Sequence, residues 1–182
     1  MFYFFGCCIF LISIFSLNQL IGENSLTADI IQPARYVSKN AGYSIQFPPT
    51  WEIVTGAMGT DVIALAPASD PSDLFRKSVN VIFAKISQNL TREEYYSFNL
   101  KSLERLLSDF DLEGSREAMI GGLEARELIF THTMGVVNVK VMQYLVLSKG
   151  KGYVITFTAN RADFEKYVKT FKQIAESLRF EV

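Results

Sequence analysis

The stretch from Glu113 to Ala159 constrains the fold most strongly, because it contains strand-like runs joined by tight turns. Gly121-Gly122 lies between two apolar runs, and paired glycines supply the positive φ values that a two-residue hairpin turn requires. Gly135 allows a second reversal, and the polar sequence at 148–152 allows a third. The stretch therefore predicts consecutive antiparallel strands, the last of them over Tyr153–Ala159.

The run that follows Gly122 has the alternation of a strand with two different faces. Side chains alternate at a period of two along a strand, so every second residue shares a face. One face is predicted to carry Leu128, Phe130, His132 and Met134, and the other Glu127, Ile129 and Thr131.

The segment after the last strand has the pattern of an amphipathic helix. Apolar residues recur there at spacings of three and four, which places them on one helical face. They are Phe164, Tyr167, Val168, Phe171, Ile174, Ala175 and Leu178. Because this face needs a sheet to cover it, the chain is predicted to have an α+β fold, an antiparallel β-sheet flanked by helices.

Shorter signals extend this fold towards the amino terminus. Alternating residues over Tyr43–Phe47 predict a strand that ends at Pro48-Pro49. Trp51 starts another strand and is expected in the core. Val79–Ile86 is apolar on both faces, so it is predicted to lie centrally in the sheet.

A capping box predicts a second helix, since Thr91 stands three residues before Glu94. Its buried face is expected to carry Tyr96, Leu100, Leu103, Leu107 and Phe110. The acidic sequence Asp109–Gly114 is then predicted as a loop at the helix end. That sequence matches the first half of an EF-hand calcium loop, but Ile120 stands where a bidentate carboxylate is needed, so calcium binding is not predicted.

Residues 1–22 form an apolar segment with no charged side chain. A run of about 16 apolar residues suits the h-region of a signal peptide, and extension through Ile21 suits a membrane anchor. A lipoprotein signal at Cys7 is the weakest alternative, because too few residues precede that cysteine. The predicted organisation is a signal peptide or N-terminal anchor over 1–22, a linker over 23–39 and one domain over 40–182.

Charge and composition exclude several classes of function. The formal net charge is −1, which disfavours nucleic acid as a partner. Cys7 and Cys8 both precede the domain, so a thiol nucleophile or thiolate metal site is excluded there. His132 is the only histidine and is expected to have a partly buried structural role. Phosphate-loop, nucleophile-elbow and dinucleotide motifs are missing, so no catalytic, cofactor-binding or metal-binding residue is predicted.

The order of these elements resembles the PsbP-like family, including its bacterial DcrB-like branch. The sequence Gly42-Tyr43-Ser44-Ile45-Gln46-Phe47-Pro48-Pro49-Thr50-Trp51 is similar to the opening hairpin of that family. The helix start at Leu90–Tyr95, the turn at Gly121–Arg126, the long strand pair and the closing aromatic helix extend the resemblance over most of residues 36–180.

The resemblance implies an α/β/α sandwich and an exported accessory protein without enzyme activity or cofactor. The expected location is periplasmic or extracellular, with a membrane tether through residues 1–21 if these are not cleaved. The expected partner is a protein of an envelope or membrane complex. A carrier of a small apolar ligand and a PsbP-type extrinsic subunit of photosystem II are the alternatives, and a hydrolase assembled from scattered residues is the least favoured hypothesis.

Overall fold

The computed structural model describes residues 34–68, 75–87 and 89–181. The signal peptide or anchor expected over residues 1–22, with Cys7 and Cys8, lies outside the described residues. Among the helices in the described ranges, none combines the length and the apolar character needed to cross a membrane.

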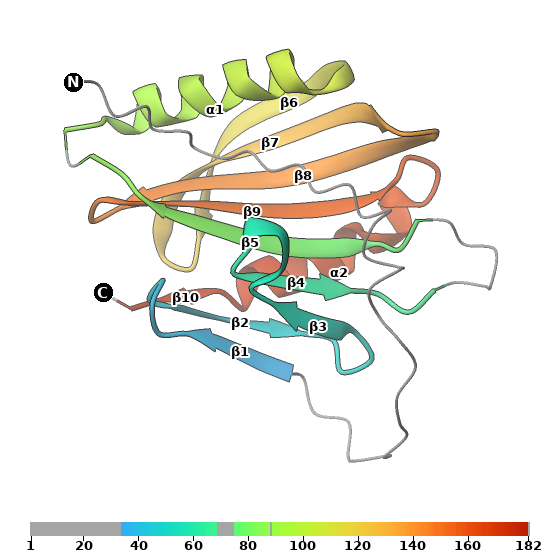
Figure 1. The fold of residues 1–182 in the computed structure, drawn as a ribbon, viewed down its shortest axis with the longest axis horizontal. Helices are drawn as coiled ribbons and strands as arrows, with labels where there is room; N and C mark the ends of the chain where they lie inside the picture. Colours follow the sequence, from blue (N-terminus) through green and yellow to red (C-terminus); the bar gives the residue numbers. More distant parts are fainter. Residues whose placement is uncertain (1–33, 69–74, 88, 182) are drawn as a thin grey trace.

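Within the described residues, the strands form two antiparallel sheets (Figure 1). The main sheet has the strand order β3-β4-β5-β9-β8-β7-β6, and the small sheet has the order β1-β2-β10. The strands of the main sheet are β3 (Glu52–Thr55), β4 (Val62–Leu65), β5 (Ser78–Lys85), β6 (Ser108–Ile120), β7 (Leu123–Met134), β8 (Val137–Ser148) and β9 (Lys151–Asn160). The remaining elements are β1 (Ala34–Ser38), β2 (Tyr43–Phe47), β10 (Arg179–Phe180), α1 (Arg92–Leu106), α2 (Phe164–Glu176) and a short 3-10 helix, η2 (Ala57–Gly59).

The main sheet is covered on both faces. Alternate side chains along its central strands belong to two different apolar clusters, one on each face. On one face, Tyr95 and Leu103 of α1 pack with Phe130 of β7. On the other face, Phe171 of α2 and Tyr43 of the small sheet belong to one cluster with the inward residues of β8 and β9. The predicted α+β fold with helices on an antiparallel sheet is confirmed (Figure 1).

The turns lie at the predicted glycines. Gly121 and Gly122 have φ values of 58° and 82° between β6 and β7, and Gly135 has a φ of 61° between β7 and β8. In β7, Leu128 and Phe130 face the α1 side, whereas Ile129 packs against the α2 side. The sequence therefore predicted both the hairpins and the two faces of β7.

The stretch before Gly121 differs from the prediction. The helix ends at Leu106, and the residues expected to be its end and an acidic loop form the first half of β6. Phe110 contacts Phe130 from this strand, with 5.3 Å between ring centroids, instead of extending the helical face. The positive φ of Asp109 and two register shifts against β7 allow the chain to turn directly from helix to strand.

Part of the linker expected over 23–39 is folded, because β1 occupies Ala34–Ser38 and pairs with β2. The carboxylate of Asp61, just before β4, holds the two sheets together. It accepts hydrogen bonds from Tyr36 at 3.2 Å, Ser38 at 3.1 Å and Tyr43 at 2.6 Å. Residues 34–38 therefore belong to the folded domain.

Candidate functional site

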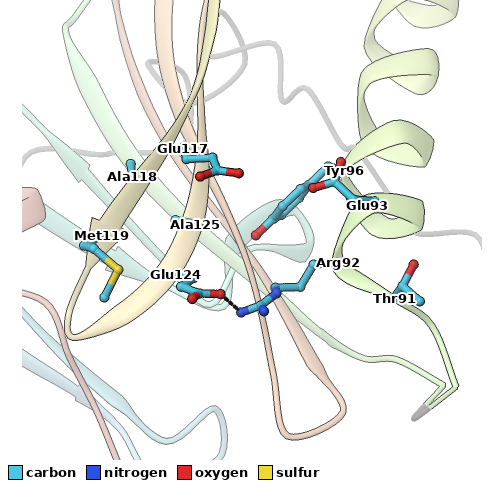
Figure 2. A pocket seen from close by; sticks show the side chains of 9 residues that line it. All are labelled: Thr91, Arg92, Glu93, Tyr96, Glu117, Ala118, Met119, Glu124 and Ala125. Carbon is cyan, nitrogen blue, oxygen red and sulfur yellow. Dashed lines mark ion pairs between the residues drawn. The ribbon is translucent and has the colours of Figure 1, made fainter.

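A cavity of about 800 Å³ lies between the start of α1 and the β6–β7 hairpin (Figure 2). We call it the α1 groove. Figure 2 shows Tyr96 reaching from the helix towards the hairpin, which carries Glu117 and Glu124. The lining residues come from three elements and are Thr91, Arg92, Glu93, Tyr96, Glu117, Ala118, Met119, Glu124 and Ala125.

The helical wall of the α1 groove begins with the predicted capping box. The Thr91 hydroxyl accepts a hydrogen bond from the Glu94 backbone amide at 3.2 Å, and Glu94 Oε2 accepts one from the Thr91 backbone amide at 2.8 Å. The hydrogen bonds from Thr91 lower the pKa of Glu94. The Thr91 hydroxyl thus caps the start of the helix. This structural role accounts for its position at the groove, so no chemical role is needed.

Most charges around the α1 groove are paired. Arg92 forms an ion pair with Glu124 across it (Figure 2). Arg126 lies 2.9 Å from Glu93 and places its guanidinium 5.3 Å from the centre of the Tyr96 ring.

Two further features define the α1 groove: Tyr96, which is 8% exposed, and the carboxylate of Glu117. Burial raises the pKa of Tyr96, although Arg92 and Arg126 oppose the shift, so Tyr96 stays a neutral aromatic surface at pH 7. Among the described residues, Glu117 has no ion-pair partner, and it is exposed on β6. The groove therefore combines an aromatic wall with an unpaired carboxylate.

A second hollow of about 360 Å³ lies on the opposite side of β6, towards α2. We call it the α2 hollow. Its floor contains the buried carboxylate of Glu127, which accepts hydrogen bonds of 2.6 Å from both Arg116 and Tyr144. Burial opposes ionisation of Glu127, but these two donors outweigh it and lower the pKa of the carboxyl. Glu127 is therefore a charged structural anchor between β6 and β8.

β6 separates the two cavities and lies at the end of the main sheet (Figure 1). Its pairing with β7 is regular from Gly114 to Ile120. Ser115, Arg116 and Glu117 are exposed in succession, and 65% of Met119 is exposed. A strand with exposed residues on both faces and one paired side is a surface at which another chain can bind.

His132 does not contribute to either cavity. It is 3% exposed and packs beside Phe130, with Nδ1 3.2 Å from the Thr133 carbonyl oxygen. Burial lowers the pKa of its imidazole, so the ring is neutral at pH 7. The burial expected from its phase with Leu128 and Phe130 is confirmed.

The residues weighed as a calcium loop, Asp109–Gly114, lie along β6, so their side chains alternate between two faces instead of converging. Within the described ranges, no three His, Cys, Asp or Glu side chains gather closely enough to hold a metal ion.

Sequence reasoning did not find Arg92, Tyr96, Glu117 and Met119 as neighbours. The helix start was predicted, but the first part of β6 was not, so the helix and the hairpin could not be placed together. Alternation in Asp109-Phe110-Asp111-Leu112-Glu113 is a strand signal that would have extended β6 and exposed its edge.

Comparisons with known proteins give a match in structure alone. No protein-family model matches the chain, and no curated protein matches its sequence. The solution structure of cyanobacterial PsbP (CyanoP) from Synechocystis sp. PCC 6803 has a TM-score of 0.63 and 16% identity, covering 87% of this chain and 98% of that one. LpqN of Mycobacterium tuberculosis, described as involved in cell envelope biogenesis, has a TM-score of 0.64 and 17% identity over 83% of this chain and 91% of its own.

A third match is PA94 of Pseudomonas aeruginosa, a protein of unknown function. Its TM-score is 0.58 and its identity 19%, over 80% of this chain and 94% of that chain. All three structures superpose on most of this chain with little sequence identity, which shows a common fold. The chain has the PsbP-like fold.

Proposed function

We propose that this chain is an exported, non-enzymatic accessory protein that binds a protein partner in an envelope or membrane complex. Its PsbP-like fold and the apolar segment at residues 1–22 support this function. LpqN, which has the same fold, is described as involved in cell envelope biogenesis.

The observation that carries the proposal is the exposed end of the main sheet. There β6 has a cavity on each face, and 65% of Met119 is exposed beside the α1 groove. Methionine is enriched at protein–protein interfaces, so an exposed methionine at the rim of a groove supports a protein-binding surface. Apart from Glu117, the charged groups around it are engaged in a helix cap and ion pairs, which position a surface and do not activate a nucleophile.

Photo-crosslinking in intact cells tests this proposal. A photoreactive amino acid in place of Met119 is expected to give a specific adduct with another protein. The matched control replaces Glu104, which is exposed on α1 and does not line the groove. Equal adduct patterns at both positions, or no adduct at Met119, would contradict a partner at this surface.

A carrier of a small apolar ligand is the second candidate, because a further groove of about 400 Å³ lies between α2 and the sheet. Its apolar lining includes Ile129, Met142, Phe164 and Val168. Its volume falls within the range of ligand sites in proteins. Native mass spectrometry of the protein purified from its own cells is expected to show a bound apolar molecule if this function is correct, and a ligand-free mass rejects it.

A further inference from the structure

We infer that the partner binds by strand addition: an extended segment pairs with β6 along Gly114–Met119 and places a lysine or arginine side chain in the α1 groove at Glu117. This inference rests on the proposed function and deepens it, because it specifies the binding mode and the chemistry of the segment. A free edge, two flanking cavities and the local charge support it.

The free edge is the first step of the argument. In the described structure, β7 is the one strand that pairs with β6, so the other side of β6 carries main-chain groups without a strand partner. The pairing with β7 has no register shift between Gly114 and Ile120, whereas the earlier part of β6 is irregular. A regular edge offers alternate N–H and C=O groups to an incoming strand.

The two cavities are the second step. In a strand added to β6, successive side chains point to opposite faces of the extended sheet. The α1 groove lies on one face of this edge and the α2 hollow on the other, and both are lined by Glu117, Ala118 and Met119. Main-chain hydrogen bonds with cavities for alternate side chains are the features by which sheet edges recognise extended peptides.

The charge around the α1 groove is the third step. Glu93 and Glu124 form ion pairs with Arg126 and Arg92, whereas Glu117 forms none among the described residues, although Arg126 lies opposite it on β7. Met119, 65% exposed, provides apolar surface beside that carboxylate, and the largely buried Tyr96 forms the wall behind it. A long basic side chain fits this combination, because its aliphatic part packs on apolar surface while its charged end reaches a carboxylate.

A second copy of the chain is a poorer occupant of the edge in the registers centred on Ser115, Arg116 or Glu117. In a two-fold antiparallel pair, the residue on the axis faces its own copy, and flanking residues pair symmetrically. An axis at Arg116 or Glu117 opposes two identical charges, and an axis at Ser115 opposes Glu117 and Glu113. Like charges directly opposite each other destabilise strand pairing, so these registers disfavour self-association.

Binding of a model peptide to the purified full chain tests the inference. The probe is end-blocked Thr-Val-Lys-Val-Lys-Val-Thr with a fluorescent label, and its match carries Glu in place of both Lys residues. The Lys peptide is expected to bind, to shift the amide signals of residues 114–119 in nuclear magnetic resonance spectra, and to bind at least about fivefold more tightly than the Glu peptide. Equal affinities, or no binding of either peptide, would overturn the inference.

Methylation of the peptide nitrogens tests the strand geometry. In a bound strand, the N–H groups of alternate residues point to opposite edges. Methylating either the Val set or the Lys set is therefore expected to abolish binding, while methylating the other set leaves it within about twofold. Equal effects of the two sets would show groove binding without strand addition.

A charge reversal tests the role of Glu117. Glu117→Lys is expected to weaken binding of the Lys peptide and to strengthen binding of the Glu peptide, each by about fivefold. Glu104→Lys is expected to leave the preference for the Lys peptide unchanged. Sedimentation velocity of the wild-type chain is expected to show a monomer, and a dimer lost in Glu117→Lys would assign the edge to a second copy. A Met119 adduct in cells without binding of the Lys peptide would reject strand addition and leave the proposed function supported.

Discussion

At the scale of single residues, Asp61 shows how one carboxylate joins two sheets. Its strongest donor is Tyr43, at 2.6 Å, and Tyr43→Phe is expected to cost about 1.5–3 kcal/mol at pH 7, the usual range for a hydrogen bond to a charged group. Urea unfolding measures this loss. A change below about 0.5 kcal/mol would mean that Tyr36 and Ser38 hold Asp61 without Tyr43.

Tyr43 also predicts how stability changes in alkali. Burial, followed by the hydrogen bond to Asp61 and its charge, raises the pKa of Tyr43 above the ordinary value of 10.0. Above that pH the unfolded chain loses the Tyr43 proton while the folded chain retains it. The stability that Tyr43 contributes is therefore fully present below pH 10 and falls as pH rises. The free energy of unfolding, measured across this pH range, is expected to fall less steeply for Tyr43→Phe than for the wild type. Equal slopes would contradict the assignment of this pH dependence to Tyr43.

Glu127 predicts the opposite dependence in acid. The hydrogen bonds from Arg116 and Tyr144 overcome burial and lower the pKa of Glu127 below its ordinary value of 4.5. The stability that Glu127 contributes is therefore present above pH 4.5 and is lost as pH falls. Glu127→Gln is expected to cost about 1–3 kcal/mol at pH 7 and to flatten this acid dependence, measured by urea unfolding at several pH values. The control Glu104→Gln, at an exposed site, is expected to stay within about 0.5 kcal/mol of the wild type.

At the scale of elements, the β6–β7 turn provides a matched pair of glycines. Both have positive φ, but a Cβ at Gly121 would lie 2.7 Å from Phe180 of β10, whereas a Cβ at Gly122 would meet nothing within 4 Å. Gly122→Ala is expected to cost about 1 kcal/mol from backbone strain, and Gly121→Ala clearly more because the turn must move away from β10. Thermal unfolding compares the two variants, and equal losses would show that the contact with Phe180 has no effect.

The hairpin elements also show which parts of the fold could be predicted from sequence. Turn chemistry at Gly121-Gly122 and Gly135 is local, so the hairpins were found from neighbouring residues. The end of α1 and the start of β6 carry conflicting signals, since Phe110 fits a helical face with Leu107 and also an alternating strand with Leu112. Pairing with β7 decides between them, and that contact is not local.

At the scale of the whole molecule, the α1 groove depends on two elements that meet only in the folded chain. Thr91–Tyr96 and Glu117–Ala125 are separated by about one helix and one strand, so their side chains become neighbours through the sheet order. From charge and composition we expected neither nucleic-acid binding nor thiol chemistry. Composition could not, however, place Glu117 beside Tyr96. Binding surfaces made from exposed residues also lack the apolar periodicity from which the core residues were predicted.

The shared core predicts that the two sheets unfold together. Phe171 of α2 is fully buried, and its ring centroid lies 5.4 Å from that of Phe157 in the main sheet, within the cluster that also contains Tyr43 of the small sheet. Phe171→Ala is expected to cost about 3–5 kcal/mol, whereas Phe98→Ala, at a site 47% exposed on α1, should cost less than about 1 kcal/mol. Trp51 fluorescence and circular dichroism during urea unfolding are expected to give coincident transitions for the wild type and for the milder Phe171→Leu. Two separated transitions would contradict a single cooperative core, because α2 could not then be stabilising both sheets at once.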